Sequence, residues 1–246
     1  GAVAQGLIWG IMAIGVYLTF RILDIADLTV DGSLGTGGAV CIMLMLSGQN
    51  VWVSMAGATA AGMAAGLATG ILHTFMGIPA ILAGILTQLG LYSINLKTMG
   101  KANQAINVDK YDLLVSLRFI RKVPFYRNTI LMVAITIIIL IAVLYWFFGT
   151  ELGCSLRATG CNDKMARAQG INTDLSRVRG LMISNGLVAL SGAMLCQYQG
   201  FADINMGRGA IVIGLAAVII GEAIFGKIFR NFGLKLLGVA LGSIIY

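Results

Sequence analysis

Charged residues are scarce in this sequence and absent from a long internal stretch. Only 11% of the 246 residues are Asp, Glu, Lys or Arg, and none lies between Gly32 and Leu96. Hydrophobic residues make up 58% of the chain, and its mean hydropathy is +0.90. An uncharged stretch of this length is tolerated only in lipid or in a protein interior inside the bilayer. The sequence therefore predicts an integral membrane protein.

Histidine and cysteine are also rare, which limits the chemistry of the chain. His73 is the only histidine and stands at the end of a hydrophobic run, before the turn sequence TFMGIP. The four cysteines have spacings that fit neither a zinc site nor a disulfide framework: Cys41, Cys154, Cys161 and Cys196. One histidine and scattered carboxylates form no acid, base or metal-ligand set. We therefore expect neither a membrane enzyme nor a bound metal or cofactor.

Ion-driven transport is disfavoured for a related reason. A secondary transporter coupled to protons or sodium needs ionisable or coordinating groups within the membrane. Residues 32–96 carry no charged side chain. Such a transporter remains the alternative interpretation of a polytopic membrane chain.

Hydrophobic runs define the expected spans, because a helix needs about 20 apolar residues to cross the hydrocarbon. Six runs approach this length: Ala2–Phe20, Val51–Leu72, Pro79–Leu96, Thr129–Phe148, Leu181–Gly200 and Ala210–Phe225. Ser33–Leu46 is shorter and is interpreted as a full span or a half-helix; Phe232–Tyr246 is interpreted as a partial span. The sequence predicts an all-α, polytopic transmembrane bundle of about 7–8 spans in one domain, residues 1–246.

Small residues recur at helical spacing inside these runs. The pattern occurs at Ala58, Gly62, Gly66 and Gly70, and again at Gly238 and Gly242. Small side chains every fourth position let helices approach closely in lipid. Ordinary packing within the chain is the favoured interpretation, and a dimer interface is the alternative.

Two hydrophilic segments are long and basic. Residues 97–127 carry seven Lys or Arg and two Asp, and residues 151–179 carry five Lys or Arg and three acidic residues. One expected span separates them, so they should lie on opposite sides of the membrane. The positive-inside rule alone would place the more basic segment, 97–127, in the cytoplasm.

The sequence GEAIFGK at Gly221–Lys227 has the spacing of a phosphate-binding loop. Ile228 follows the lysine where a Ser or Thr hydroxyl is needed for magnesium, and the preceding run reads as a membrane span. We reject nucleotide binding here. Glu222 keeps interest as an ionisable group near the end of a span, with a plain interfacial position as the alternative.

The stretch DIADLTVDGS places two aspartates around a threonine. Asp27 and Asp31 flank Thr29, and Gly32 and Ser33 are expected as helix breaker and helix cap. One interpretation is a capped start of the next helix. The other is an unwound stretch that lines a cavity, since irregular backbone survives at membrane depth only where protein or water satisfies it. On that view a substrate path includes Asp27, Thr29, Asp31, Gly32 and Glu222.

The segment SLRATGCNDKMARAQGIN, residues 155–172, resembles a piece of soluble protein between two spans. Asn162 is expected to cap a helix of about two turns that Gly170 ends. Two turns are too short to be stable alone in water. The exposed Ala and Met side chains favour docking into a groove of a partner, with an inert amphipathic connector on the lipid headgroups as the alternative.

The same segment resembles the coupling segment of permease subunits in binding-protein-dependent ABC importers of the branched-chain amino acid and ribose class. Matching positions are Gly153, Leu156, Arg157, Ala158, Gly160, Asn162, Ala166, Gly170 and Ile171. Cys161 departs from the Glu often found before the Asn. GLIWGIMAIGVYLTFRILDIADLTVDGS is similar to the first span and polar turn of these permeases, and GRGAIVIGLAAVIIGEAIFG to a late span. RILDIADLTVDGS resembles the branch associated with tryptophan and tyrosine uptake.

This resemblance implies a permease subunit in a bacterial plasma membrane that moves a small solute inward; the expected solute is an amino acid, and the tryptophan and tyrosine branch implies an aromatic one. A sugar or nucleoside permease is the alternative. The implied partners are a second permease copy, a cytoplasmic ATPase dimer that performs the hydrolysis, and an extracytoplasmic substrate-binding lipoprotein; no nucleic acid is implied. Residues 153–172 would be cytoplasmic, which places 97–127 outside. The implied ATPase-coupling residues are Arg157, Ala158, Gly160, Asn162, Met165, Ala166 and Gly170.

Overall fold

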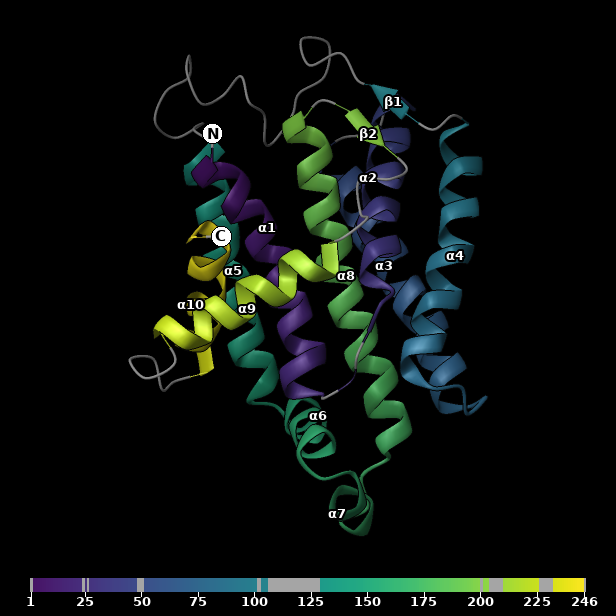
Figure 1. The fold of residues 1–246 in the computed structure, drawn as a ribbon, viewed down its shortest axis with the longest axis vertical. Coiled ribbons are helices and arrows are strands. Elements are labelled where there is room, and N and C mark those ends of the chain that lie inside the picture. Colours follow the sequence, from purple (N-terminus) through teal and green to yellow (C-terminus); the bar gives the residue numbers. More distant parts are fainter. Residues whose placement is uncertain are drawn as a thin grey trace.

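The computed structural model describes residues 2–23, 25, 27–47, 51–100, 103–105, 129–199, 201–203, 210–225 and 232–245. The regular secondary structure of this part of the chain is helical except for one short two-stranded ribbon (Figure 1). The elements are α1 (Ala2–Tyr17), the π-helical turn η1 (Leu18–Ile22), α2 (Val30–Leu46), α3 (Val51–Thr74), α4 (Ala80–Met99), β1 (Asn103–Ala105), α5 (Thr129–Phe148), α6 (Glu151–Cys161), α7 (Asp163–Ala168), α8 (Thr173–Gln199), β2 (Phe201–Asp203), α9 (Ala210–Phe225) and α10 (Phe232–Ile245).

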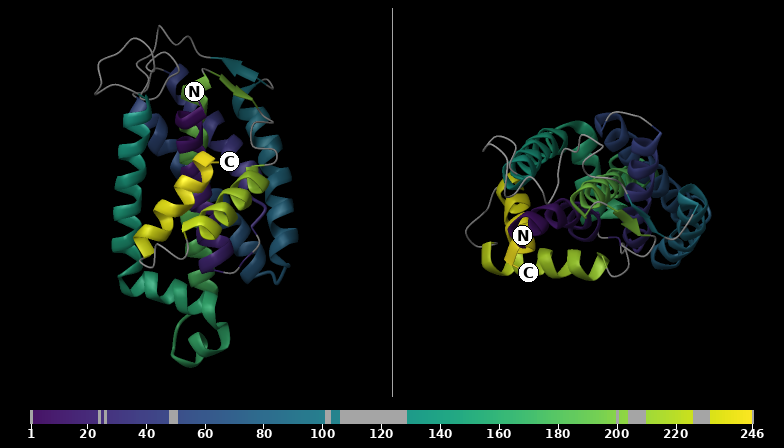
Figure 2. Two further views of the ribbon diagram at one scale, coloured as in Figure 1. Left: turned by 60° about the vertical axis from the view of Figure 1, so that its left-hand side comes forward. Right: turned by 90° about the horizontal axis from the view of Figure 1, so that it is seen from above.

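Helix α8 forms the centre of the bundle. It packs against α1, α2, α3 and α6, while α9 and α10 pack on each other and on α1 (Figures 1 and 2). The α8 side chains between residues 184 and 198 are nearly all buried, polar ones included. A helix that is buried all round belongs to the interior of a membrane bundle.

Three helices are long and apolar enough to cross a membrane among the described residues: Trp52–Thr74, Ala80–Met99 and Thr173–Tyr198. Four shorter apolar helices accompany them, at Gln5–Phe20, Val30–Leu46, Ile211–Ile224 and Leu236–Ile245. Helices α5 and α6 form a pair bent by 77°. The predicted helical membrane bundle is confirmed, whereas the span count stays a prediction.

The stripe of small residues on α3 packs inside the chain. A Cβ at Gly62 would overlap the Asn185 carbonyl oxygen, and one at Gly66 would overlap that of Leu181. Both of these contacts are with α8, so the stripe serves the close approach of α3 and α8. In the second small-residue stretch, a Cβ at Gly242 would overlap the carbonyl oxygen of Ala217 and the backbone of Gly221, both in α9. A dimer interface at these glycines, the alternative from the sequence, is therefore wrong.

The structure corrects the expected start of α2 and supports the rejection of a phosphate-binding loop at Gly221–Lys227. Gly32 and Ser33 lie inside α2, which begins at Val30, so their expected roles as breaker and cap are wrong. The GEAIF part of the phosphate-loop lookalike is the end of α9, and Gly221 packs against the backbone of Gly238. This helical packing supports the rejection of a nucleotide site; Lys227 lies outside the described residues.

Candidate functional site

The segment between α5 and α8 folds as two short helices joined at one residue. The Thr150 side chain accepts a hydrogen bond from the Gly153 N–H at the start of α6. Asn162 ends α6 and caps α7, because its Oδ1 accepts from the Met165 N–H at 3.1 Å. Gly170 ends the second helix with φ +88°, a conformation that favours glycine. The predicted Asn162 cap and Gly170 terminator are confirmed.

Ionic contacts hold α7 against the start of α8. Arg177 pairs with Asp163 at 2.9 Å, and Arg167 donates from Nε to the Thr173 hydroxyl at 2.7 Å. Arg167 also reaches the Asp174 carboxylate at 3.4 Å. A six-residue helix has no stability of its own in water, so these contacts with α8 set its position.

The residues expected to couple to an ATPase divide into an outer and an inner group. Met165 is 62% exposed, and Asn162 and Gly170 are exposed beside it. Ala166 is 2% exposed and faces the interior of the segment. Arg157 is half-buried, with its guanidinium 5.5 Å from the centroid of the Phe148 ring, within cation–π range.

Gly160 belongs to the inner group and is pressed against the end of η1. A Cβ at this position would overlap the carbonyl oxygen of Ile22 and lie 3.0 Å from the Leu23 Cα. On the other side, a Cβ at Gly180 of α8 would overlap the Leu23 side chain. Leu23 is therefore held between α6 and α8, at the point where the chain leaves η1 towards α2.

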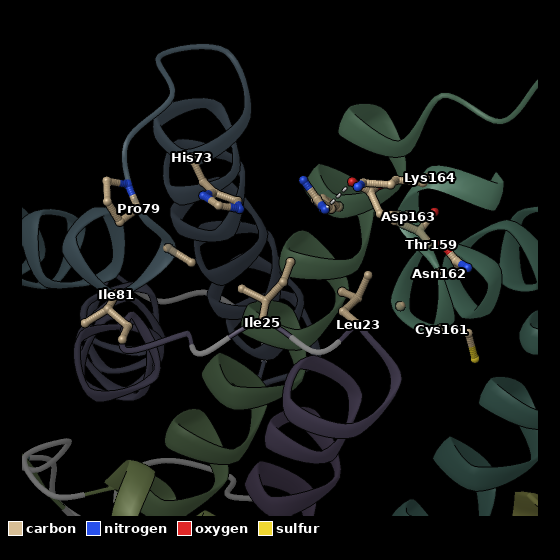
Figure 3. Close-up of a pocket in the computed structure, with 13 residues that line it drawn as sticks. Leu23, Ile25, His73, Pro79, Ile81, Thr159, Cys161, Asn162, Asp163 and Lys164 are labelled. Carbon is tan, nitrogen blue, oxygen red and sulfur yellow. Dashed lines mark ion pairs between the residues drawn. The ribbon is translucent and has the colours of Figure 1, made fainter. Parts of the chain in front are cut away.

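A groove of about 660 Å³ separates α6 and α7 from the turn between α3 and α4 (Figure 3). His73, Pro79 and Ile81 lie on one side. The His73 Nδ1 is 2.9 Å from the carbonyl oxygen of Ile78, so the histidine side chain holds the turn between α3 and α4.

Asn162, Asp163 and Lys164 lie on the other side of the groove, and Leu23 and Ile25 lie between the two walls (Figure 3). The Asp163 Oδ1 is buried and has no hydrogen-bond partner among the described residues, since the Arg167 Nε is 3.9 Å away. Asn162, Asp163 and Lys164 make their wall of the groove polar, whereas Pro79 and Ile81 beside His73 make the opposite wall largely apolar. Within the described residues, no cluster of three or more His, Cys, Asp or Glu side chains exists.

A buried polar cluster lies above this groove, where the chain is irregular between η1 and α2. Asp27 is 1% exposed; its Oδ1 accepts the Thr29 N–H at 3.0 Å, and its Oδ2 accepts Asn185 Nδ2 at 2.8 Å. The Ser33 hydroxyl donates to Asn185 Oδ1 at 2.5 Å. The Thr29 and Thr69 hydroxyls are 2.6 Å apart. These contacts join the irregular stretch to α2, α3 and α8 at once.

The five residues expected in a substrate path do not form one cluster. Asp27 and Thr29 belong to the buried network, whereas the half-buried Asp31 accepts the Ile211 N–H at 3.0 Å at the start of α9. A Cβ at Gly32 would meet the Leu91 side chain of α4 at 3.0 Å. Glu222 is half-buried near the end of α9. Their transport role stays a prediction.

Sequence reasoning missed the partners in this cluster. Thr69 lies within an apolar run, and Asn185 follows Ser184 within another, so no pattern singles them out. The available signal was that a polar side chain in the middle of a membrane span faces the bundle interior and finds a partner there.

The two basic segments start from opposite ends of the bundle. β1 pairs antiparallel with β2 at one end, while α6 and α7 lie at the other (Figure 1). This agrees with the expectation that one span separates the segments. Residues 106–128, which hold most of the basic side chains of 97–127, lie outside the described residues.

Comparison with known proteins decides the family. The sequence model of the family described as the permease component of branched-chain amino acid transport systems matches residues 1–246. The chain belongs to this permease family. It is 38% identical over 242 residues to a tyrosine transport system permease protein of Clostridioides difficile, covering 98% of this chain and 78% of that protein.

Two other relatives show the range of the family. An uncharacterized protein of Rickettsia prowazekii is 36% identical over 231 residues, which is 94% of this chain and 79% of that protein. The autoinducer 2 import system permease protein LsrC of Yersinia pestis is 30% identical over 214 residues, which is 86% of this chain and 58% of that protein.

Membership of this family makes the chain an integral membrane permease component of an ABC transport system. Such a component is not an enzyme, and ATP hydrolysis resides in a partner subunit. The family also implies a substrate-binding protein as a second partner. The resemblance drawn from residues 153–172 is thereby confirmed at the level of the family.

Proposed function

We propose that this chain forms the transmembrane channel of an ABC importer that moves an amino acid inward across a bacterial plasma membrane. The relative from Clostridioides difficile, which is named for tyrosine transport, supports an amino acid and an aromatic one in particular. The charge-free run from Gly32 to Leu96 suits a passage that an external ATPase drives rather than ion coupling. The bundle crosses the membrane in 7–8 spans, about as many as the apolar helices require.

The contact of Gly160 with the end of η1 connects the ATPase end to the bundle interior. When the ATPase moves α7, α6 moves with it and displaces the Ile22 carbonyl and Leu23. Leu23 is also in contact with α8 on its other side. Leu23 leads directly to Asp27 and Thr29, whose hydrogen bonds reach α2, α3 and α8. Movement of α6 therefore displaces a stretch of irregular backbone, which bends more easily than a helix.

The outer surface of α7 receives the ATPase in this proposal. Lys164, Met165 and Ala168 are exposed on it, and the exposed Gln169 follows its last residue; this surface lies beside the groove of Figure 3. Residues 153–172 are then cytoplasmic, and 97–127 face outside and receive the substrate-binding lipoprotein. Arg157, Ala158 and Gly160 transmit the movement, and Asn162, Ala166 and Gly170 shape the segment. A second copy of the chain completes the channel.

The proposed solute path runs beside the polar cluster. Asp27, Thr29 and Gly32 border it at the start of α2, and Asp31 joins this region to α9, which carries Glu222. Because Asp27 and Thr29 are fully enclosed in the present structure, the path opens here only when the irregular stretch moves. The same movement that α6 transmits would provide this opening.

ATP-driven uptake into proteoliposomes tests the proposal. The chain is reconstituted with its ATPase and binding protein, and uptake of radiolabelled tyrosine, leucine and ribose is measured with ATP, without ATP, and with an imposed proton gradient. We expect ATP-dependent uptake of an amino acid. Uptake driven by the gradient without ATP, or uptake of ribose alone, would contradict the proposal.

A further inference from the structure

A second cavity, of about 430 Å³, lies between α2, α3 and α4, apart from the groove at α6 and α7. Its volume falls within the range of roughly 300–1,000 Å³ that is usual for small-molecule sites. One wall is a row of alanines on α3, at positions 61, 64, 65 and 68. Larger side chains face it from α2 and α4: Val40, Leu86, Leu91 and Ile94.

The alanine wall determines the shape of what fits. Methyl side chains on one helix face leave a shallow, smooth surface, whereas the branched side chains opposite reach towards it. Gly90 of α4 widens the space further, because a Cβ there would meet nothing within 4 Å. A slot with one smooth wall suits a flat ring packed face-on, which contacts apolar groups on both sides.

Three threonines and one amide, Thr36, Thr87, Thr98 and Asn95, line this otherwise apolar cavity. Asn95 is 3% exposed and lines the cavity. The Thr36 hydroxyl lies 2.9 Å from the Asn95 Oδ1 and 2.9 Å from the Gly32 carbonyl oxygen, which fixes one end of the amide. The other end has no protein partner in the described part of the chain. That end of the amide lies at the cavity wall, where a ligand group can form a hydrogen bond with it.

A hydroxyl group is the best match to this amide. Thr36 has a single proton and two acceptors within reach, so the amide pairs with it in either orientation and presents either a donor or an acceptor to the cavity. A hydroxyl both donates and accepts and therefore pairs with either. An acyl chain of a lipid does neither and would leave the Asn95 amide unpaired.

We propose that this cavity is a side-chain subsite for a hydroxylated aromatic ring, with Asn95 as the residue that recognises the hydroxyl. The ring lies between the alanines of α3 and the branched side chains of α4, with its hydroxyl at Asn95. This inference rests on the proposed transport function and names the solute class for it. The permease thereby contributes selectivity of its own.

Equilibrium binding to the purified transporter, this chain with its ATPase in lipid nanodiscs, tests the subsite. Radiolabelled tyrosine is displaced by unlabelled tyrosine, phenylalanine or a fatty acid. We expect phenylalanine to compete about tenfold more weakly than tyrosine, since one buried hydrogen bond is worth about that factor. Asn95→Leu should abolish the difference by weakening tyrosine, and Gly90→Leu should weaken both amino acids by filling the slot.

Gln88→Leu is the matched control, because it removes an amide from the same helix outside the cavity lining. It should leave both affinities unchanged. The inference is overturned if no saturable binding occurs, if tyrosine and phenylalanine compete equally in the unmutated protein, or if the fatty acid displaces tyrosine as well as tyrosine itself does. If Asn95→Leu leaves ATP-driven uptake of tyrosine unchanged, the subsite is overturned and the proposed function stands. If tyrosine binds more tightly than phenylalanine but ATP drives no uptake, the proposed function is overturned and the subsite stands.

Discussion

The side chain of Asn185 on α8 holds the Asp27 carboxylate at 2.8 Å, although 158 positions of sequence separate them. The other end of the same amide accepts the Ser33 hydroxyl, so one residue of the central helix fixes the chain on both sides of the start of α2. All three residues are buried. Polar contacts of this kind specify one arrangement of helices where apolar packing alone allows several.

Loss of the Asn185 amide should therefore destabilise the bundle. Asn185→Leu leaves the Asp27 carboxylate with one partner fewer and the Ser33 hydroxyl unpaired, which we expect to cost about 2–3 kcal/mol. The measurement is the unfolding of the purified chain in detergent. Gln169→Leu removes an exposed amide from the residue that follows α7 and should change stability by no more than about 0.5 kcal/mol. Equal stability of the two variants would refute a structural role for the Asn185 contacts.

Gly160→Ala should separate ATP hydrolysis from transport. Its methyl group would overlap the Ile22 carbonyl, so α6 must shift away from the end of η1, and the contact that transmits movement is lost. We expect normal assembly and ATP hydrolysis with uptake reduced at least tenfold. Gly149→Ala is the matched control, since its methyl group meets backbone oxygens only at 3.4 Å and 3.6 Å. Normal uptake by Gly160→Ala would remove this contact from the mechanism.

The sequence predicted the helices well and the interior contacts poorly, for a physical reason. Hydrophobic length marks a span wherever it occurs, and a local cap such as Asn162 is written in neighbouring residues. The Asp27–Asn185 pair depends instead on which helix faces come together, which no local pattern records. For the same reason Gly32 and Ser33 imitate a helix start, although tertiary contacts with α4 and α8 place them inside α2.

Exposure on α7 distinguishes docking residues from packing residues. Met165→Asp places a charge on an exposed position that the proposal assigns to the ATPase, and we expect association with the ATPase to weaken about tenfold without loss of stability. Ala166→Trp, at a buried position, should instead destabilise the segment by overpacking, at about 1–3 kcal/mol. Affinity for the ATPase and thermal stability are measured for both variants. Reduced stability of Met165→Asp would show that Met165 packs within the chain.

The sidedness of the membrane can be tested with a natural thiol. Cys161 is exposed beside the groove, whereas Cys41 and Cys196 are buried, so a variant that keeps Cys161 alone reports on the α6–α7 end. A membrane-impermeant maleimide should label it in inside-out vesicles and not in intact cells, because the proposal makes this end cytoplasmic. Bound ATPase should slow the labelling, since α7 is its docking surface. Lys97 is exposed near the end of α4, at the end of the bundle away from α6 and α7. A variant whose single thiol is at Lys97→Cys should be labelled in intact cells and not in inside-out vesicles, and bound ATPase should not change its labelling rate. Labelling of Cys161 from outside intact cells would show that the topology is the reverse of the proposed one, with 97–127 in the cytoplasm as the positive-inside rule favours. It would also show that α7 is not the docking surface of the ATPase.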